Sequence, residues 1–506
     1  MNVSRRFFAL GALGITVSLL LAACEAAVSP SSSAAGTPPE SITTPRASAP
    51  PAPPAPSVTS VPSASAGGAS PEPGGSWVRA GAPEMWLQYE AVVPLGDGGA
   101  LAIGEDAMDA ERWDPATATW RQVAALNAPR THFAAVSLRD GRVLVTGGVH
   151  DDDSGRSQAY SSTYLYDPST PAGSWTKVGL LGTARVAPAI AFLPDGRVLV
   201  AGGAYINGPA WGDSASAGIM LASSLSSEPG RGTAGRGPLN DIPPPSIGAG
   251  LATAELFDPS TGRWSPTGSM HFARAGAVAV TLSDGRVLVV GPDSSDVGAG
   301  WAADLDPRVF GTAEVYDPAT ERFSLVGSLP PIDRDAIAKA GVDVPNSPQV
   351  SIFMGTLVAL PDGGAFLVGH SDQWKHAGSV TRTFRFDAAS ESWHQVGKAW
   401  AGFEDWDDQM AWHQTPGIDL EGAFAAALPD GRLLVAGGTT TDASGENWEA
   451  SRVAHAYNPV TDSWSDLPSM PWDAGVGHAV ALVDGSILLV ANEADAKNSI
   501  RFIPSP

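Results

Sequence analysis

The chain is dominated by a short pattern that recurs seven times after residue 76. Each copy has an apolar run, an Asp-Gly pair and a second apolar run that ends in small residues. Asp-Gly between two strand-like runs is a strong hairpin signal, because both central residues of a type I′ turn need positive φ. The pattern predicts seven such hairpins, at Asp97-Gly98, Asp140-Gly141, Asp195-Gly196, Asp284-Gly285, Asp362-Gly363, Asp430-Gly431 and Asp484-Gly485.

A second pattern follows the hairpins: an aromatic residue, Asp-Pro, and a Trp six residues after the Asp, as in W-D-P-A-T-A-T-W at 113–120. Asp and Pro at the first two positions favour a type I turn. This turn would join two further strands, so each unit becomes a four-stranded antiparallel meander with strands a, b, c and d. The last unit has only three such runs, and S-W-V-R-A-G-A-P at 76–83 resembles an orphan d strand. We expect the two to pair and to remove both exposed edges.

These patterns resemble a known repeat family. Paired glycines follow strand b, as in R-V-L-V-T-G-G at 142–148 and R-V-L-V-A-G-G at 197–203, and the aromatic-Asp-Pro…Trp spacing recurs beside them. Both resemble kelch repeats, the blades of β-propellers such as the central domain of galactose oxidase. The resemblance implies an all-β, seven-bladed propeller of kelch type over residues 76–506, with four-stranded antiparallel blades and the N-terminal strand completing the last blade.

The first 75 residues have a different character. S-R-R-F-F-A-L at 4–10 is close to a twin-arginine export signal, and L-A-A-C at 21–24 resembles a bacterial lipobox. We therefore expect residues 1–23 to be a signal peptide and Cys24 to carry lipid; an uncleaved anchor or an ordinary signal peptide are the alternatives. Residues 24–75 are mostly Ala, Ser, Pro, Thr and Gly. Such a composition predicts a disordered tether. The domain would then be exported and lipid-anchored to the bacterial cell membrane or envelope.

Charge and cysteine content exclude several functions. The chain has 53 acidic and 30 basic residues and a formal net charge of -23, which opposes binding to nucleic acid. Cys24 is the only cysteine. No internal disulfide or cysteine cluster for zinc can therefore form. The resemblance to galactose oxidase cannot extend to its copper site, which needs a tyrosine cross-linked to a cysteine, so we expect no copper radical oxidase.

The two rims of the predicted propeller differ in the length of their connections. The Asp of Asp-Pro and the following Trp are six residues apart in every blade but one, whereas Asp-Gly and the next Asp-Pro position are 17 to 63 residues apart. Loops on a rigid scaffold carry function. We therefore look for a site on the rim of the b–c and d–a connections. The longest connection, 204–250, reads as padding or a lid.

The connections of blades five and six concentrate acidic and aromatic residues, at 370–376, 399–414 and 445–449. Trp faces beside carboxylates suit neutral sugars, and they also suit cations. Alternatively, the Trp residues only fold the connections onto the propeller. The predicted ligand-binding residues are Asp372, Trp374, His376, Trp406, Trp412, His413, the pair Glu446-Asn447 and Trp448, and the candidate catalytic carboxylates are Glu404, Asp405, Asp407 and Asp408.

Arg130, Arg185 and Arg274 each lie just before a strand a. Planar guanidinium groups could hold a carboxylate or sulfate there, or they could be part of the repeat's own structure. The run H-D-D-D at 150–153 could help to bind Ca²⁺ or could be solvated charge. No metal site and no cofactor are predicted, with Ca²⁺ left open.

These features favour a membrane-anchored binding module whose partner is an extracytoplasmic glycan or an envelope protein. The alternative is a carbohydrate-active enzyme, a hydrolase or a sugar mutarotase, that uses the carboxylates of the connections as acid and base. A third possibility is a structural subunit of an envelope complex. Fold alone does not decide between them.

Overall fold

The computed structural model describes 18 stretches of the chain between residues 74 and 505: 74–84, 89–104, 107, 109–126, 128–151, 156–206, 220–222, 247–291, 311–330, 354–371, 380–396, 400–401, 404–406, 412–414, 423–441, 448–471, 477–491 and 499–505. These residues form β-strands and connections, without helices, so none of them belongs to a helix long and apolar enough to cross a membrane. The signal peptide, Cys24 and nearly all of the tether lie outside the described residues.

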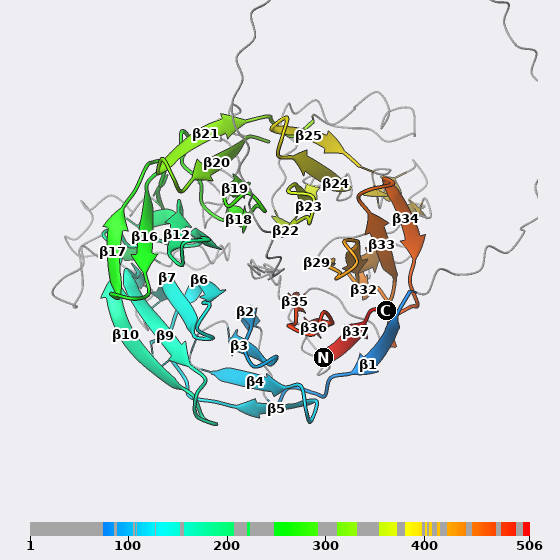
Figure 1. Ribbon diagram of the computed structural model, residues 1–506, viewed down its shortest axis with the longest axis horizontal. Helices are drawn as coiled ribbons and strands as arrows, with labels where there is room; N and C mark the ends of the chain where they lie inside the picture. The colour runs from blue at the N-terminus through cyan, green and yellow to red at the C-terminus, as the bar shows by residue number, and fades with distance from the viewer. Residues whose placement is uncertain are drawn as a thin grey trace, which may run out of the picture. The chain divides into compact units, whose positions relative to one another are not determined.

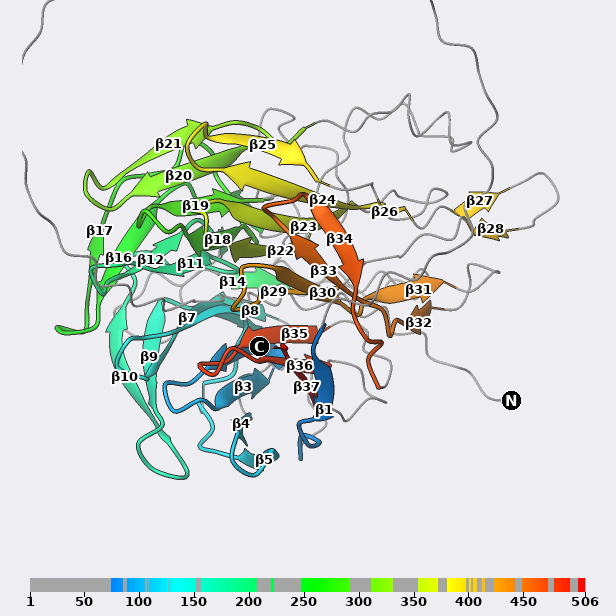
Figure 2. The same cartoon turned by 45° about the vertical axis from the view of Figure 1, so that its right-hand side comes forward.

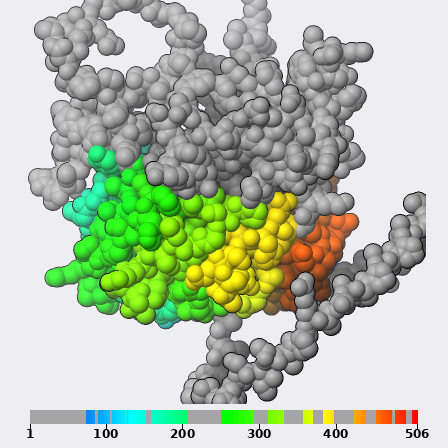
Figure 3. Space-filling view, turned by 90° about the horizontal axis from the view of Figure 1, so that it is seen from above, coloured from blue at the N-terminus to red at the C-terminus, as the bar shows by residue number. Residues whose placement is uncertain are grey.

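The strands form seven four-stranded antiparallel blades arranged around a ring, with strand a innermost and strand d outermost (Figure 1). This confirms the predicted architecture. Seen from the side, blades three to six form a continuous outer wall (Figure 3). Blade one is β2 (Tyr89–Pro94), β3 (Ala100–Gly104), β4 (Ala110–Asp114) and β5 (Thr119–Gln122); blade two is β6 (Thr131–Ser137), β7 (Val143–Asp151), β9 (Ser162–Asp167) and β10 (Ser174–Leu180); blade three is β11 (Ala189–Phe192), β12 (Val198–Ala201), β16 (Ala254–Asp258) and β17 (Arg263–Pro266).

The other four blades repeat this order. Blade four is β18 (Val278–Thr281), β19 (Val287–Val290), β20 (Ala313–Asp317) and β21 (Arg322–Val326); blade five is β22 (Met354–Ala359), β23 (Ala365–Ser371), β24 (Val380–Asp387) and β25 (Ser392–Gln395); blade six is β29 (Phe424–Ala427), β30 (Leu433–Ala436), β33 (Ala454–Asn458) and β34 (Ser463–Asp466); blade seven is β35 (Gly477–Ala481), β36 (Ile487–Ala491), β37 (Ser499–Ile503) and β1 (Ser76–Arg79).

The core lies between neighbouring blades. Inner strands such as β11 and β29 are rich in alanine and fully buried, as the branched residues of strands b are. Seven of the hydrophobic clusters combine side chains from adjacent blades. Small side chains allow the inner strands to approach one another near the axis, while branched side chains fill the wider space outside.

The ring closes as predicted, because β1 pairs with β37 as the fourth strand of blade seven. Trp77 packs on Phe502 with ring centroids 4.8 Å apart and donates from Nε1 to the carbonyl of Pro468 in blade six. The Ser499 hydroxyl accepts a hydrogen bond from Trp120 of blade one at 2.8 Å. The first and last strands of the propeller therefore hold blades six, seven and one together.

The predicted two-residue type I′ turn at the Asp-Gly pairs is wrong. In blade three, Gly196 N donates to Leu193 O and Leu193 N donates to Arg197 O, so the hairpin loop has three residues. Glycine has positive φ in all seven turns and aspartate in none. This is the type I turn with a glycine bulge, in which the residue before Asp occupies the second turn position. The aspartate Oδ1 instead accepts the backbone N–H two residues on, for example Arg197 N at 2.9 Å.

The Asp-Pro turns join strands c and d as predicted. In blade three, Gly262 N donates to Asp258 O at 2.8 Å, and Asp258 Oδ1 accepts Ser260 N. The residue that closes the turn has positive φ, +67° at Gly262 and +52° at Ala118 of blade one. We call the rim of the Asp-Gly and Asp-Pro turns the turn rim, and the opposite rim, where the b–c and d–a connections run, the connection rim.

Candidate functional site on the connection rim

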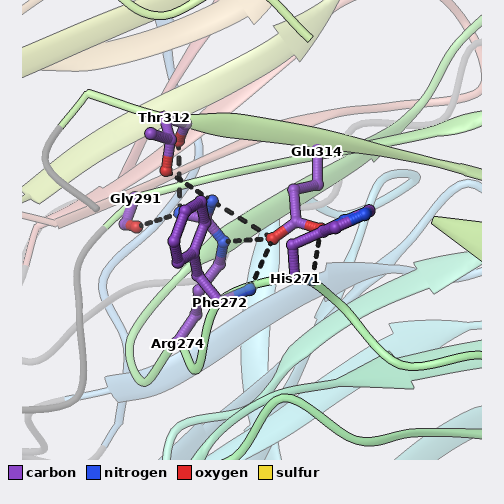
Figure 4. A network of polar contacts seen from close by, with 6 residues as sticks. All are labelled: His271, Phe272, Arg274, Gly291, Thr312 and Glu314. Carbon is purple, nitrogen blue, oxygen red and sulfur yellow. Dashed lines mark hydrogen bonds and ion pairs between the residues drawn. The ribbon is translucent and has the colours of Figure 1, made fainter. Parts of the chain in front are cut away.

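A buried network of hydrogen bonds and ion pairs underlies the connection rim, and it is most complete in blade four (Figure 4). Glu314 of β20 accepts hydrogen bonds from the backbone N–H groups of His271 at 2.7 Å and Phe272 at 3.2 Å. Arg274 contacts the same carboxylate at 3.4 Å. Its Nη1 also donates to Gly291 O, just after strand b, and to Thr312 O, just before strand c. One ion pair therefore ties the d–a connection to both ends of the b–c connection.

Blade three repeats this arrangement. Glu255 accepts from Gly182 N at 2.6 Å and from Arg185 Nη2 at 2.9 Å, and Arg185 Nη1 donates to Gly202 O and Thr253 O, each at 2.8 Å. Burial lowers the pKa of Arg185, while the carboxylate of Glu255 acts in the opposite direction. We call each such pair with its carbonyl partners an Arg–Glu clamp.

The clamps also explain the paired glycines. Gly202 has a φ of +69°, and a Cβ built on it would lie 2.3 Å from the carbonyl oxygen of Arg274 in the next blade. Gly203 N donates to that same carbonyl at 2.6 Å. Only glycine permits this approach without backbone strain. The clamp arginine of one blade is thereby fixed to strand b of the blade before it.

Blade two contains a variant of the clamp. Arg130 donates to the carbonyls of Ala128, Gly147 and Ser162, and its guanidinium lies over the rings of Tyr160 and Tyr164 at 4.5 and 5.1 Å. Burial lowers the pKa of Arg130. Tyr164 occupies the strand position that Glu255 and Glu314 occupy in blades three and four, so cation–π contacts stand where an ion pair stands elsewhere.

In blade one the carboxylate is present, and a tyrosine hydroxyl contacts it. Glu111 of β4 accepts a hydrogen bond from the Tyr89 hydroxyl and from Glu84 N at 2.6 Å. The pKa of Tyr89 is raised well above its ordinary value, first by burial and second by the hydrogen bond to Glu111. The carboxylate again ties strand c to the d–a connection.

The three arginines predicted to bind an anion, Arg130, Arg185 and Arg274, are thus 1% exposed or less and bonded to the protein itself. This arrangement agrees with the alternative that the three arginines are part of the structure of the repeat itself. Sequence reasoning missed the carboxylate partners of Arg185 and Arg274, although a signal exists. Glu stands three residues before the turn aspartate in A-E-R-W-D, A-E-L-F-D and A-E-V-Y-D, at Glu111, Glu255 and Glu314.

The connections on this rim also contain additional strands. Of the long 204–250 connection, β13 (Ala204–Ile206) pairs with β15 (Ile247–Gly250), and β14 (Met220–Ala222) pairs with β8 (Arg156–Ala159) of blade two. β26 (Trp400–Ala401) extends blade five by pairing with β24. The described parts of the 204–250 connection therefore include ordered hairpin strands, and they link the connection rims of blades two and three.

Two hairpins carry the predicted acidic and aromatic residues, and they project beyond the blades on one side of the ring (Figure 2). β27 (Glu404–Trp406) pairs with β28 (Trp412–Gln414), which places Asp405 opposite His413 and Trp406 opposite Trp412. β31 (Thr439–Thr441) pairs with β32 (Trp448–Ala450), which places Trp448 opposite Thr441. The remaining predicted residues, Asp372, Trp374, His376, Asp407, Asp408 and the pair Glu446-Asn447, lie outside the described residues.

The first hairpin brings together residue types suited to sugar binding. Two tryptophans and an Asp–His pair share neighbouring cross-strand positions, and directly opposite positions are the closest in an antiparallel ladder. Within the described stretches, no group of three or more His, Cys, Asp or Glu side chains is arranged to hold a metal ion. The Asp152 and Asp153 part of the acidic run at 150–153 lies outside those stretches.

The architecture and the repeat pattern define the class of protein, a seven-bladed β-propeller. The Kelch motif family matches residues 422–471, which include blade six. The protein is therefore a seven-bladed β-propeller with a kelch motif in blade six. An F-box/kelch-repeat protein of Arabidopsis thaliana is 27% identical over 143 residues, which make up 28% of this chain and 25% of that protein. The chain thus matches about a quarter of the length of this relative.

A solved structure entitled "Structure of YjhT" aligns with 71% of this chain and 94% of its own, at a TM-score of 0.39 and 15% identity. The assignment to the propeller class does not depend on this alignment, because the blade order and register of the chain itself define it.

Proposed function

We propose that the protein is an exported, lipid-anchored propeller that binds an extracytoplasmic ligand through the connection rim of blades five and six. The ligand is a neutral glycan or an envelope protein partner. A kelch propeller is suited to a binding role, because its blades hold variable connections on a rigid ring. The residues at 397–414 include four carboxylates and a single lysine, which favours a neutral or basic partner over an acidic one.

The observation that carries this proposal is the β27–β28 hairpin. It places Trp406 opposite Trp412 in a connection far longer than any turn on the other rim. A connection that served only to join blades would not need a second layer of strands. Tryptophan faces bind apolar faces of sugar rings, and neighbouring carboxylates accept hydrogen bonds from hydroxyl groups.

A glycan array tests the ligand class. The chain without its signal peptide, with Cys24→Ser, would be compared with the same chain carrying Trp406→Ala and Trp412→Ala. We expect the double substitution to abolish glycan binding and to leave the unfolding midpoint unchanged, since neither residue belongs to a blade. Val460→Ala is the control, because Val460 is 88% exposed and lies on the turn rim. An array without hits would favour a protein partner, and equal binding by all variants would refute the proposed site.

The membrane anchor has its own test. Cys24→Ala should move the exported protein from the membrane fraction to the soluble fraction, and palmitate labelling should disappear with it. The lipobox motif is the support for this part of the proposal, because the only cysteine of the chain falls at the lipidated position. Retention of Cys24→Ala in the membrane fraction would refute the lipid anchor.

The Asp405–His413 pairing supports a second candidate function, a hydrolase or a sugar mutarotase. A carboxylate beside a histidine can hold and transfer a proton at neutral pH. Asp405→Asn and Asp407→Asn would then abolish turnover of a bound sugar while leaving its affinity within a few-fold. Loss of binding without any measurable turnover in the parent chain would instead support the binding module. Ca²⁺ stays a candidate ligand of the acidic connections, tested by whether its addition raises the unfolding temperature.

A further inference from the structure

We propose that the lipid-anchored protein turns its turn rim toward the membrane and its connection rim away from it. The rim that carries the candidate site would then meet a neutral or basic partner beyond the bilayer, and would not meet the lipid headgroups. This inference rests on the proposed lipid anchor at Cys24, and it follows from where the chain enters the ring.

The entry point is fixed by the register of the closing strand. Ser76 lies opposite Ile503 and Arg79 opposite Ile500, so β1 begins where β37 ends. In the other blades, this end of strand c leads into the Asp-Pro turn, as at Asp258 of β16 and Asp317 of β20. The residues that precede Ser76 therefore join the propeller at the turn rim. The tether lies directly before Ser76 in the sequence, and as a flexible coil it would average about 40 Å in length.

The charge of the turn rim supports the same orientation. Each of the seven Asp-Gly turns has its aspartate paired with an arginine. In four blades the arginine directly follows the Asp-Gly pair, for example Arg432 with Asp430 at 2.7 Å. In three blades the arginine comes from strand c. Seven of the chain's 30 basic residues are committed to this one ring of turns; they are Arg112, Arg142, Arg197, Arg286, Arg385, Arg432 and Arg501.

The turn rim also links neighbouring blades by charge. Arg197 of blade three reaches Glu321 of blade four at 2.7 Å, and Arg286 of blade four reaches Glu391 of blade five. A bacterial membrane carries anionic lipid, which attracts basic side chains and repels uncompensated carboxylates near its surface. A protein of formal charge -23 therefore approaches the membrane at lower cost through the face on which seven aspartates are each paired with an arginine.

The connection rim has the opposite character. The 399–414 connection has Glu404, Asp405, Asp407 and Asp408 and no lysine or arginine, and the 150–153 run adds three aspartates. Such a rim is repelled by anionic headgroups and attracts a basic surface. Entry point and charge thus agree, although they are independent features of the chain.

Two single-cysteine variants measure the orientation. Ala319→Cys places a thiol on the Asp-Pro turn of blade four, and Ser269→Cys places one on the d–a connection that leads into the same blade; both positions are exposed. In the lipidated full-length chain Cys24 is blocked, so the new cysteine is the only free thiol. A donor dye on that thiol and acceptor-labelled lipid, in vesicles of phosphatidylethanolamine and phosphatidylglycerol, report the distance of each rim from the bilayer.

Energy transfer should be at least about two-fold greater from residue 319 than from residue 269, because a blade strand of about five residues separates the rims by roughly 17 Å. The Cys24→Ser chain mixed with the same vesicles should show no transfer from either label. Equal transfer from both labels, or more from residue 269, would overturn the orientation and leave the anchor intact. A full-length chain that does not float with vesicles would overturn the anchor, and the orientation with it.

Discussion

The tryptophans of the outer strands offer a sharp test of how the blades are joined. Trp264 of blade three donates from Nε1 to the Thr163 hydroxyl of blade two at 2.9 Å. Trp120 of blade one donates in the same way to Ser499 of blade seven at 2.8 Å. Thr163 and Ser499 occupy the same position in strand c, four residues before its last residue. In these two blades a hydroxyl at this position accepts the indole N–H of the following blade, whereas Thr383, at the same position in blade five, donates to Val396 O at 2.6 Å.

Blade four lacks this hydroxyl, because Ala313 occupies the position. Trp393 of blade five packs in the same cluster as Ala313, and its Nε1 is buried without a hydrogen-bond partner in the described structure. A buried donor without a partner costs about 1–3 kcal/mol. We predict that the Ala313→Ser hydroxyl accepts the hydrogen bond from Trp393 Nε1. This bond should recover about 1 kcal/mol or more of the cost of the unpaired N–H, which offsets the cost of burying the new hydroxyl.

Ala254→Ser is the matched control. Ala254 occupies the same strand position in blade three, but the following blade presents Phe323, which has no N–H to donate. Its new hydroxyl is buried without that partner and should lower the free energy of unfolding by about 1–3 kcal/mol. Urea unfolding of both variants gives the difference, and we expect Ala313→Ser to be the more stable by at least about 1 kcal/mol. Equal destabilisation would show that the indole N–H does not need this acceptor.

The remaining predictions concern the clamps and a buried histidine. Gly202→Ala should lower the free energy of unfolding by more than about 3 kcal/mol, because its Cβ would lie 2.3 Å from Arg274 O. Gly196→Ala should cost only about 1–2 kcal/mol of backbone strain, because nothing lies within 4 Å of its Cβ. Urea unfolding compares the two variants. Glu314→Gln leaves the Arg274 guanidinium buried without its counter-charge and should lower the free energy of unfolding by about 3 kcal/mol, and a parent-like midpoint would contradict the clamp. Burial lowers the pKa of His478, so the folded protein holds it neutral while the unfolded chain takes up a proton below pH ~6.5; stability should fall as pH drops below that value, by up to about 1.4 kcal/mol per pH unit, and His478→Gln should flatten the slope.

The fold could be predicted because its signals are local. Each Asp-Gly and Asp-Pro turn specifies a reversal within a few residues, and the apolar runs between them specify the strands. The error in turn type arose at the residue before the aspartate. Pro194, Pro361 and Pro429 stand there in three blades. Proline favours the second position of a type I turn and cannot be accommodated in the two-residue loop we predicted. That signal was present in the sequence and was not used.

The candidate site was less predictable because it depends on long-range contacts. Arg185 is bonded to Glu255, 70 residues away, and β14 pairs with β8 across two blades. The position of an arginine before strand a does not show whether it points to solvent or to a carboxylate, and only the recurring Glu three residues before the turn aspartate indicates the second. The connection lengths, by contrast, were visible in the sequence, and they identified the rim on which the additional hairpins lie.

The clamp carboxylate is absent from four blades, and these include the two blades that carry those hairpins. The clamp carboxylate of blades one, three and four is replaced by Phe384 in blade five and by His455 in blade six. Burial lowers the pKa of His455, and it contacts the largely exposed Asp466 at 3.0 Å, whereas the clamp carboxylates are buried. Blades two and seven lack the carboxylate as well, with Tyr164 and Ile500 at its position, so the loss of the clamp does not by itself mark a functional blade. The functional assignment of this part of the connection rim therefore rests on its long acidic and aromatic connections, because variable loops on a rigid scaffold carry function.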